Sequence, residues 1–456
     1  MGTATLQALS SECRVRCTRS FRSARAAQSH HSPSISTLKT IITLLIASVT
    51  TCLAGPTSEI AEPSGGLTLR QALALALTRS PELAAVGYDI RIAEARILQA
   101  KLIPNPETDF TSENVGGGSD LAEHTLLLGQ LIELGGKRRA RVREARAGRD
   151  LADFDYETKK REVFLKTAQH FVDLLAAQRR VAVNEQLVKL GDEFIPAVER
   201  RVEAGRASDL EKTRFDIAVA SARIDLEQAR QDVIAARRSL AAQWGAKEPH
   251  FTSAVGDLEA TPATPSFDAL ANRLAANPRL ARFGAEIAQR EAALAREKAA
   301  AVPDLTLRAG PRRLEDTDET TAVIGFSLPL PFWNRNQGNI GAARERVARA
   351  GAEEAAVSAV LITELSDAYQ ILARSRAAIE ILRERVLPGG ENALTATNEG
   401  YEAGRFSYLD VLDARRTIGA ARIQYLQALT EYHKALHTIE ALTANPRRTT
   451  FTDSSK

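Results

Sequence analysis

Cysteine is almost absent from this sequence and is confined to its start. The 456 residues include three cysteines, Cys13, Cys17 and Cys52, and a single methionine. With no thiol beyond residue 52, the body of the chain cannot carry a disulfide scaffold, a cysteine-ligated zinc site, an iron–sulfur cluster or a cysteine nucleophile. One methionine likewise excludes a methionine ladder for copper.

An excess of one charge sign and a long apolar run are also missing. The 60 basic and 57 acidic side chains leave a net charge of +3, too balanced for a protein that binds nucleic acid by neutralising phosphates. No apolar run reaches the roughly 18 residues of a membrane-spanning helix, which excludes a polytopic helical membrane protein. Because no phosphate-binding loop, dinucleotide loop or catalytic triad pattern occurs, we predict no enzyme activity, no catalytic residue and no cofactor.

Residues 1–54 have the composition of a leader and signal peptide. Lys39 precedes the apolar run 41–49, and small residues follow, which predicts cleavage after Ala54. Lipidation of Cys52 is an alternative, although Thr51 is a poor residue before such a cysteine. The arginine-rich first 38 residues also fit an organellar transit peptide or an over-extended start. The leader carries a net charge of +5, which leaves −2 for the rest of the chain.

The remaining sequence repeats itself. Residues 203–210 return as 402–409 with six of eight positions identical, Ser80-Pro81 returns as Asn277-Pro278, and Pro104 returns as Pro303. These landmarks occur in the same order, which indicates a tandem duplication. The predicted organisation is an N-terminal linker, a first repeat, a second linker, a second repeat and a tail, at residues 55–66, 67–247, 248–265, 266–443 and 444–456.

Each repeat is predicted to contain the same elements, which gives a mainly α fold with short β-strands. A long first helix (67–102 and 266–301) precedes a β-hairpin (106–132 and 304–330), and a pair of very long helices follows (137–202 with 208–246, and 338–402 with 407–443). Ile418, Tyr425, Tyr432 and Ile439 recur every seven residues, which predicts coiled-coil packing.

The predicted strands alternate apolar and polar residues. Leu305, Leu307 and Ala309 alternate with Thr306, Arg308 and Gly310, and residues 321–328 do the same. Strands of about 10 residues can cross a bilayer, but a membrane barrel needs about eight of them and tolerates no open edge. Four strands per chain therefore require several chains to share one barrel, and three chains would supply twelve strands. A small soluble sheet is the alternative.

Together these features resemble the TolC family of outer membrane efflux channels, and within it the cobalt–zinc–cadmium (CzcC-like) heavy-metal branch. The resemblance rests on three motifs: Gly-Gly-Lys-Arg at 135–138, Leu-Pro-Leu-Pro-Phe-Trp-Asn-Arg-Asn-Gln-Gly at 328–338, and residues 401–414. It implies a homotrimer in the bacterial outer membrane, with a twelve-stranded β-barrel in the lipid that continues as a periplasmic α-barrel. The implied partners are a periplasmic adaptor protein and an inner-membrane resistance–nodulation–division pump.

The repeated Glu-Ala-Gly-Arg motifs predict the tips of the two long helical hairpins. Gly205 and Gly404 suit the left-handed conformation that ends a helix, and Ser208 with Glu211, and Ser407 with Asp410, form capping boxes that start the next one. From sequence alone they are turns. The resemblance adds that the tips dock the adaptor, through Gly205, Arg206, Ser208, Gly404, Arg405, Phe406 and Ser407.

The resemblance also implies a periplasmic gate. Asp410 and Asp413 match the family's pore-facing acid pair, and a three-residue spacing places both on one helix face. Tyr401 matches the gate tyrosine, and Glu211 stands where the first tip carries an aspartate. Phe406 departs from the family, because some channels carry a gating arginine there; the charged latch is then absent or rebuilt around Arg405.

The function expected from these residues is a passive conduit that exports heavy-metal cations. His433 and His437 have a metal-ligand spacing but no third ligand nearby in sequence, so we predict no metal site. A multidrug or secretion channel of the same fold is the first alternative. An exported coiled-coil scaffold without a pore is the second.

Overall fold

The computed structural model describes residues 61–116 and 122–443. The predicted leader, the first half of the 55–66 linker, the 444–456 tail and the three cysteines lie outside the described residues, as does most of the glycine-rich turn at 116–120. The described residues belong to one compact unit that begins at Ala61.

The first half of this unit contains two short helices, a β-hairpin and two long helices. In order they are β1 (Gly66–Thr68), α3 (Leu69–Arg79), α4 (Pro81–Lys101), β2 (Glu107–Glu113), β3 (Glu123–Ile132), α5 (Lys137–Glu203), α6 (Asp209–Ala241) and η2 (Ala242–Trp244). Helix α5 has 67 residues, which corresponds to a length of about 100 Å. It continues through Pro196, although proline removes one backbone donor there.

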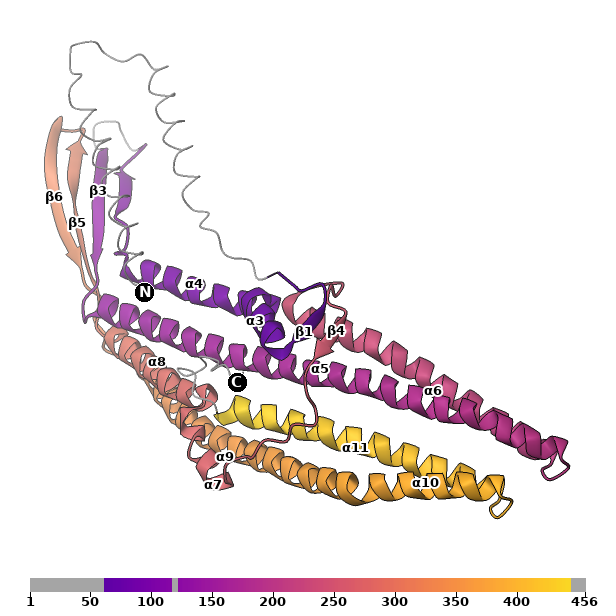
Figure 1. Ribbon diagram of the computed structural model, residues 1–456. Helices are drawn as coiled ribbons and strands as arrows, with labels where there is room; N and C mark the ends of the chain where they lie inside the picture. The colour runs from indigo at the N-terminus through magenta and orange to yellow at the C-terminus, as the bar shows by residue number, and fades with distance from the viewer. Residues whose placement is uncertain (1–60, 117–121, 444–456) are drawn as a thin grey trace, which may run out of the picture. The chain divides into compact units, whose positions relative to one another are not determined.

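The second half follows the same plan. Its elements are β4 (Ser253–Val255), α7 (Phe267–Ala271), η3 (Leu274–Ala276), α8 (Pro278–Ala300), β5 (Leu305–Leu314), β6 (Glu319–Ser327), α9 (Gln337–Ile381), the π-helical turn η4 (Leu382–Val386), α10 (Leu387–Glu402) and α11 (Tyr408–Thr443). Figure 1 shows the strands at one end of the long helices and the α5–α6 and α10–α11 turns at the other.

The predicted first helix of each half is wrong, because each is interrupted. Ser80 ends α3 and caps α4 by accepting a hydrogen bond from the Leu83 N–H, with Pro81 at the first helical position. In the second half, Asn277 follows the short turn η3 and caps α8 by accepting a hydrogen bond from the Arg279 N–H, with Pro278 at the first helical position. Proline suits the first turn but breaks a helix interior, so a cap followed by proline starts a new helix.

The segment between the halves is more than a linker. Within 248–265, β4 pairs in parallel with β1, so that Leu67 lies opposite Ala254. The helix that the sequence predicts from Leu67 starts instead at Leu69. Thr68 caps it, and the Thr68 and Gln71 side chains form a capping box. The Glu62 carboxylate accepts hydrogen bonds from the Trp244 indole (3.2 Å) and the His250 N–H (2.7 Å), which ties the start of the described chain to this segment.

Two buried clusters hold the long helices together. The larger one joins α3, α5, α9 and α11 with the segment around β4, and a smaller one lies near the helical turns. The predicted heptad seam of α11 is confirmed as a buried stripe, with Ile418, Tyr432 and Ile439 at most 2% exposed. Tyr425 is partly buried at the edge of the same stripe.

The helical stretch from Gln337 to Glu402 is long and apolar enough to cross a membrane, judged by length and composition alone, with a mean hydropathy of 1.2 in its most apolar 18-residue window. Only 22% of that window is buried within the chain. One such helix is weak evidence for a membrane-spanning segment, and it is the only candidate among the described residues. Its apolar surface is instead available for contacts with other chains.

Candidate functional site

The four long strands form one antiparallel sheet in the order β2-β3-β5-β6. Register pairs Phe110 with Leu126, Ala309 with Ile324, and Leu307 with Phe326, so these side chains share one face. Ile324 and Phe326 are 85% and 75% exposed, far more than a soluble protein would leave uncovered over one contiguous surface. The predicted alternation of β5 and β6 is therefore confirmed, and it produces an apolar outer face.

The opposite face of the sheet is polar and charged. Arg308 lies 3.9 Å from Asp109, and Arg312 forms an ion pair with Glu123 at 3.0 Å and donates to the Thr125 hydroxyl at 3.1 Å. A sheet that is apolar on one side and charged on the other has the pattern of a wall between lipid and water. The edge strands β2 and β6 have no second neighbour among the described strands.

Both helical turns end their helices in the same way. At the first tip the Arg206 and Gly205 N–H groups donate to the Arg201 and Val202 carbonyls at 2.8 and 2.9 Å, with Gly205 at φ 67°. At the second tip the Arg405 and Gly404 N–H groups donate to Gly400 and Tyr401 at 2.7 and 3.0 Å, with φ 77° at Gly404. These are Schellman motifs, and the left-handed conformation explains the glycines.

The two capping boxes differ. At the second tip, Asp410 accepts hydrogen bonds from the Ser407 N–H and hydroxyl at 2.8 and 2.7 Å, and these bonds lower the pKa of its carboxyl group. At the first tip, the Ser208 hydroxyl accepts from the Glu211 N–H at 3.3 Å. No hydrogen bond from the Ser208 N–H or hydroxyl to the Glu211 carboxylate occurs among the described contacts, so only half of that predicted box forms.

Of the predicted gate residues, the structure exposes some and buries others. Asp410 and Asp413 are exposed on the first turns of α11, and Glu211 is half-buried on α6. Tyr401 is fully buried within the chain, and burial raises the pKa of its phenol. Tyr401 therefore does not face an open space in this protomer.

Tyr401 belongs to an aromatic cluster that joins the two hairpins near their tips. Its ring lies 5.3 Å from that of Phe194 on α5, and Phe215 on α6 lies 5.8 Å from Phe194 and 6.0 Å from Tyr408 on α11. The hydroxyls of Tyr401 and Tyr408 are buried without a hydrogen-bond partner. The sequence analysis did not identify this cluster, because its members come from four different helices.

The remaining tip residues lie at the surface. Arg206, Ser208, Arg405, Phe406 and Ser407 are all exposed. The Phe406 ring packs back over its own hairpin, since a Cβ atom placed on Gly400 would lie 2.0 Å from it. The Arg405 side chain makes no hydrogen bond or ion pair among the described residues, and the expectation of a latch around it stays a prediction.

The histidine pair on α11 makes separate contacts. His433 Nε2 lies 2.9 Å from the Leu258 carbonyl, and His437 Nδ1 lies 2.9 Å from Glu440. Burial lowers the pKa of His433. Within the ranges 61–116 and 122–443, no group of three or more metal-ligating side chains comes together.

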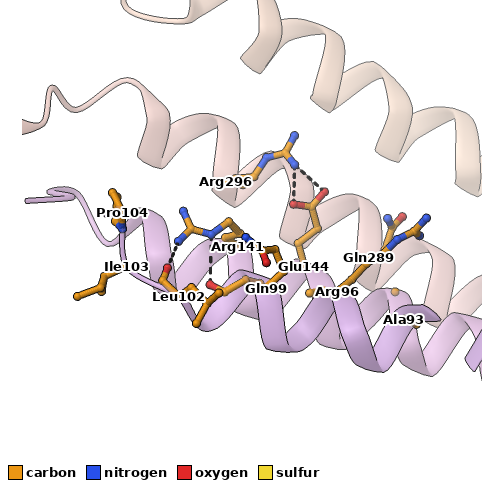
Figure 2. A pocket seen from close by; sticks show the side chains of 13 residues that line it. Ala93, Arg96, Gln99, Leu102, Ile103, Pro104, Arg141, Glu144, Gln289 and Arg296 are labelled. Atoms are coloured by element: carbon orange, nitrogen blue, oxygen red, sulfur yellow. Dashed lines mark hydrogen bonds and ion pairs between the residues drawn. The ribbon is translucent and has the colours of Figure 1, made fainter. Parts of the chain in front are cut away.

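A groove of about 540 Å³ lies where α4, α5 and α8 meet below the sheet (Figure 2). Arg141 forms a bidentate ion pair with Glu133 and also donates to the Ala100 and Leu102 carbonyls at the end of α4, at 3.2 and 3.0 Å. Arg296 pairs with Glu144 at 2.9 Å across the groove. These charged side chains pair with one another and with backbone carbonyls, and the contacts join α4, α5, α8 and the end of β3. We therefore assign the groove a structural role.

Comparison with known proteins identifies the family. The model of the family described as "Outer membrane efflux protein" matches residues 72–246 and 269–445. The chain belongs to the outer membrane efflux protein family. It is therefore an outer membrane efflux channel and not an enzyme, and the scaffold alternative falls away.

Similar members of this family include metal-resistance proteins. The chain is 36% identical to the cobalt-zinc-cadmium resistance protein CzcC of Cupriavidus metallidurans, over 84% of this chain and 91% of that one. It is 28% identical to the nickel-cobalt-cadmium resistance protein NccC of Alcaligenes xylosoxydans, over 64% and 66%. It is also 26% identical to the pyoverdine export outer membrane protein OpmQ of Pseudomonas aeruginosa, over 72% of each chain.

Solved structures of efflux channels share the fold. CusC matches with a TM-score of 0.70 at 17% identity, over 82% of this chain and 91% of that one. The Campylobacter jejuni channel CmeC matches with a TM-score of 0.68 at 17% identity, over 83% and 86%. Channels with this TolC-like fold are trimeric and work in tripartite systems.

Proposed function

We propose that this channel exports heavy-metal cations as the outer membrane component of a tripartite efflux system. The observation that carries the proposal is the 36% identity to CzcC across nearly the whole of both chains. The exposed acid pair Asp410 and Asp413 on one face of α11 supports it, because carboxylates around a constriction favour cations. The chain itself holds no nucleotide-binding motif, so the energy comes from a pump.

The assembled form we propose is a homotrimer embedded in outer membrane lipid. The four-stranded sheet has two open edges, which the hydrocarbon region does not tolerate. Helix α6 also carries Leu210, Ile217 and Ile224 at heptad spacing, 58%, 62% and 68% exposed. Such a stripe is a coiled-coil seam without a partner, and the exposed apolar residues of α9 and α10 in a neighbouring protomer would cover it.

The two tips are the proposed docking sites for a periplasmic adaptor, which links the channel to an inner-membrane resistance–nodulation–division pump. The support is geometric: both tips have the same Schellman turn, and their polar side chains are exposed. The docking residues are Gly205, Arg206, Ser208, Gly404, Arg405, Phe406 and Ser407. Tyr401, Glu211, Asp410 and Asp413 form the proposed gate just beyond them.

The proposed domain organisation places one repeat in each half. The two stretches that match the family fall inside the repeats 67–247 and 266–443, apart from the last two matched residues. The segment 248–265 connects them and pairs with β1, and the leader 1–54 directs export.

Deletion of the gene in its own host tests the substrate class. Growth on zinc, cobalt, cadmium, nickel and copper would be compared with growth on drugs and under iron limitation. We expect lower tolerance of one or more of the divalent metals, restored by the intact gene on a plasmid. Unchanged metal tolerance together with lost drug tolerance or siderophore release would instead support a channel for organic substrates, as the similarity to OpmQ would allow.

A further inference from the structure

The two helical hairpins of one protomer are joined by an arginine near their tips. Arg201, in the last turn of α5, donates from Nη1 to the Tyr401 carbonyl near the end of α10 and from Nη2 to the Arg206 carbonyl at 3.4 Å. Its guanidinium carbon also lies 4.3 Å from the centre of the Tyr401 ring. One side chain therefore contacts both tip turns at once.

A second arginine makes the reciprocal contact. Arg415, on α11 of the second hairpin, places its guanidinium carbon 4.5 Å from the Phe194 ring and 5.6 Å from the Phe215 ring of the first hairpin. Burial without an acidic partner lowers the pKa of Arg415 to about 10. Arg415 is half-buried at this contact, and partial removal from water strengthens the attraction between a cation and an aromatic face.

Neither arginine pairs with a carboxylate among the described residues. Their partners are aromatic rings and backbone carbonyls, and the Nε atom of each is buried without a hydrogen bond. A latch made of arginine and carboxylate would be weakened by any divalent cation that binds the carboxylate. A contact between arginine and an aromatic ring offers such a cation no ligand.

We propose that Arg201 and Arg415 act as a reciprocal clamp that holds the two hairpin tips of each protomer together and keeps the periplasmic end of the resting channel closed. The clamp takes the place of a latch at Phe406 or Arg405, because the Phe406 ring packs against Gly400 of its own hairpin and the Arg405 side chain is exposed. Arg201 and Arg415 are positioning residues, because they set where Tyr401 and the start of α11 lie. The proposal depends on the chain being a channel and does not depend on the exported substrate.

Single-channel recording in planar bilayers tests the clamp. Arg201→Ala and Arg415→Ala each remove one side of it. Arg200→Ala and Arg416→Ala are matched controls, since both neighbours are exposed arginines whose side chains make no hydrogen bond or ion pair among the described residues. We expect each clamp variant to raise the ratio of open to closed time about fivefold or more. The double variant should give less than the product of the two effects, because the residues share one cluster. The controls should behave as wild type.

The distance between the tips provides an independent measurement. Spin labels at Glu203→Cys and Glu402→Cys report on the two hairpins, and the native sequence has no cysteine after residue 52 to interfere. In assemblies with one labelled protomer diluted among unlabelled ones, we expect a narrow distance distribution in wild type and a broad one in the clamp variants. The wild-type distribution should be the same with millimolar zinc as with a chelator.

Each outcome bears on the proposal. Gating and distances in Arg201→Ala that equal those of Arg200→Ala would overturn it, and so would a wild-type distribution that broadens in zinc. If Arg201→Ala does not assemble, Arg201→Lys replaces it, because lysine keeps the charge but lacks the planar fork that bridges two carbonyls and a ring. Wild-type gating in assembled Arg201→Lys would equally contradict the clamp.

Discussion

Ser407 and Asp410 hold each other at the start of α11. The Asp410 carboxylate accepts the Ser407 N–H and hydroxyl at 2.8 and 2.7 Å, and the Ser407 hydroxyl in turn accepts the Asp410 N–H at 3.4 Å. The proposed gate carboxylate thus also caps the helix that carries it. The order of the second tip therefore depends on whether the Asp410 carboxylate is charged.

This coupling predicts a pH dependence of the second tip. The pKa of Asp410 in the folded chain lies below its ordinary value of 3.8, so its stabilising contribution is complete above that value and is lost as pH falls through the folded pKa. Hydrogen-exchange protection of residues 408–412 should therefore fall below about pH 4. Asp410→Ala should abolish this dependence and leave the segment poorly protected at neutral pH. Glu211→Ala is the matched control at the first tip, where no return bond exists, and should change protection little.

The acid pair predicts a preference for cations. Asp410→Ala combined with Asp413→Ala should shift the reversal potential in a potassium chloride gradient toward zero, because the constriction loses its negative field. The channel should still assemble, since both side chains are exposed and the loss of order expected from Asp410→Ala is confined to the second tip. Glu402→Ala removes an exposed acid just before the tip and serves as the control. An unchanged reversal potential in the double variant would remove these residues from the gate.

The two faces of the sheet predict opposite tolerance of charge. Ile324→Arg places a guanidinium on the apolar face and should cost about 2–4 kcal/mol if the position lies near the bilayer midplane. Ser327→Arg, three residues along the same strand, lies on the polar face and should be tolerated. Heat-modifiable gel mobility of the folded channel in outer membrane fractions measures both. Equal assembly of the two variants would mean that the apolar face does not meet lipid.

Gly310 predicts a strict steric limit between β3 and β5. A Cβ atom at this position would lie 1.9 Å from the Leu126 carbonyl oxygen, and backbone atoms of a paired strand cannot move aside. Gly310→Ala should therefore destabilise the sheet by about 1–3 kcal/mol, which would lower the midpoint temperature of thermal unfolding. Gly325 on β6 has nothing within 4 Å of the same atom, so Gly325→Ala should leave the midpoint almost unchanged.

The long elements could be predicted because their signals are local and repeated. The α11 heptad from Ile418 to Ile439 and the alternation around Ile324 each extend over several periods, so neighbouring residues reinforce one prediction. The break before α4 was missed, although Ser80 followed by Pro81 is itself a cap and a first-turn proline.

Which residues pack together near the tips could not be predicted in the same way. Tyr401 is buried because Phe194 and Arg201, about 200 residues away in sequence, lie against it. The pairing of β1 with β4 was missed for a related reason, since strands of three residues leave no period to detect. Contacts between distant segments depend on how the halves pack, and no local period or motif in the sequence reports that packing.

The π-helical turn at 382–386 changes which side of its helix faces inward. Before this turn, Leu372, Ser375, Ile379 and Leu382 are buried at intervals of three and four. After it, Leu394, Gly400 and Tyr401 are buried, and the Leu394 and Tyr401 side chains lie one position later than the same series would give. The wide turn has absorbed one extra residue, which amounts to about 100° of rotation. Removal of a single residue between Leu382 and Val386 would consequently leave the packing of α9 unchanged but rotate α10, which would turn Tyr401 away from Phe194. A deletion some 15 residues from Tyr401 would thus break the contact between the two hairpin tips.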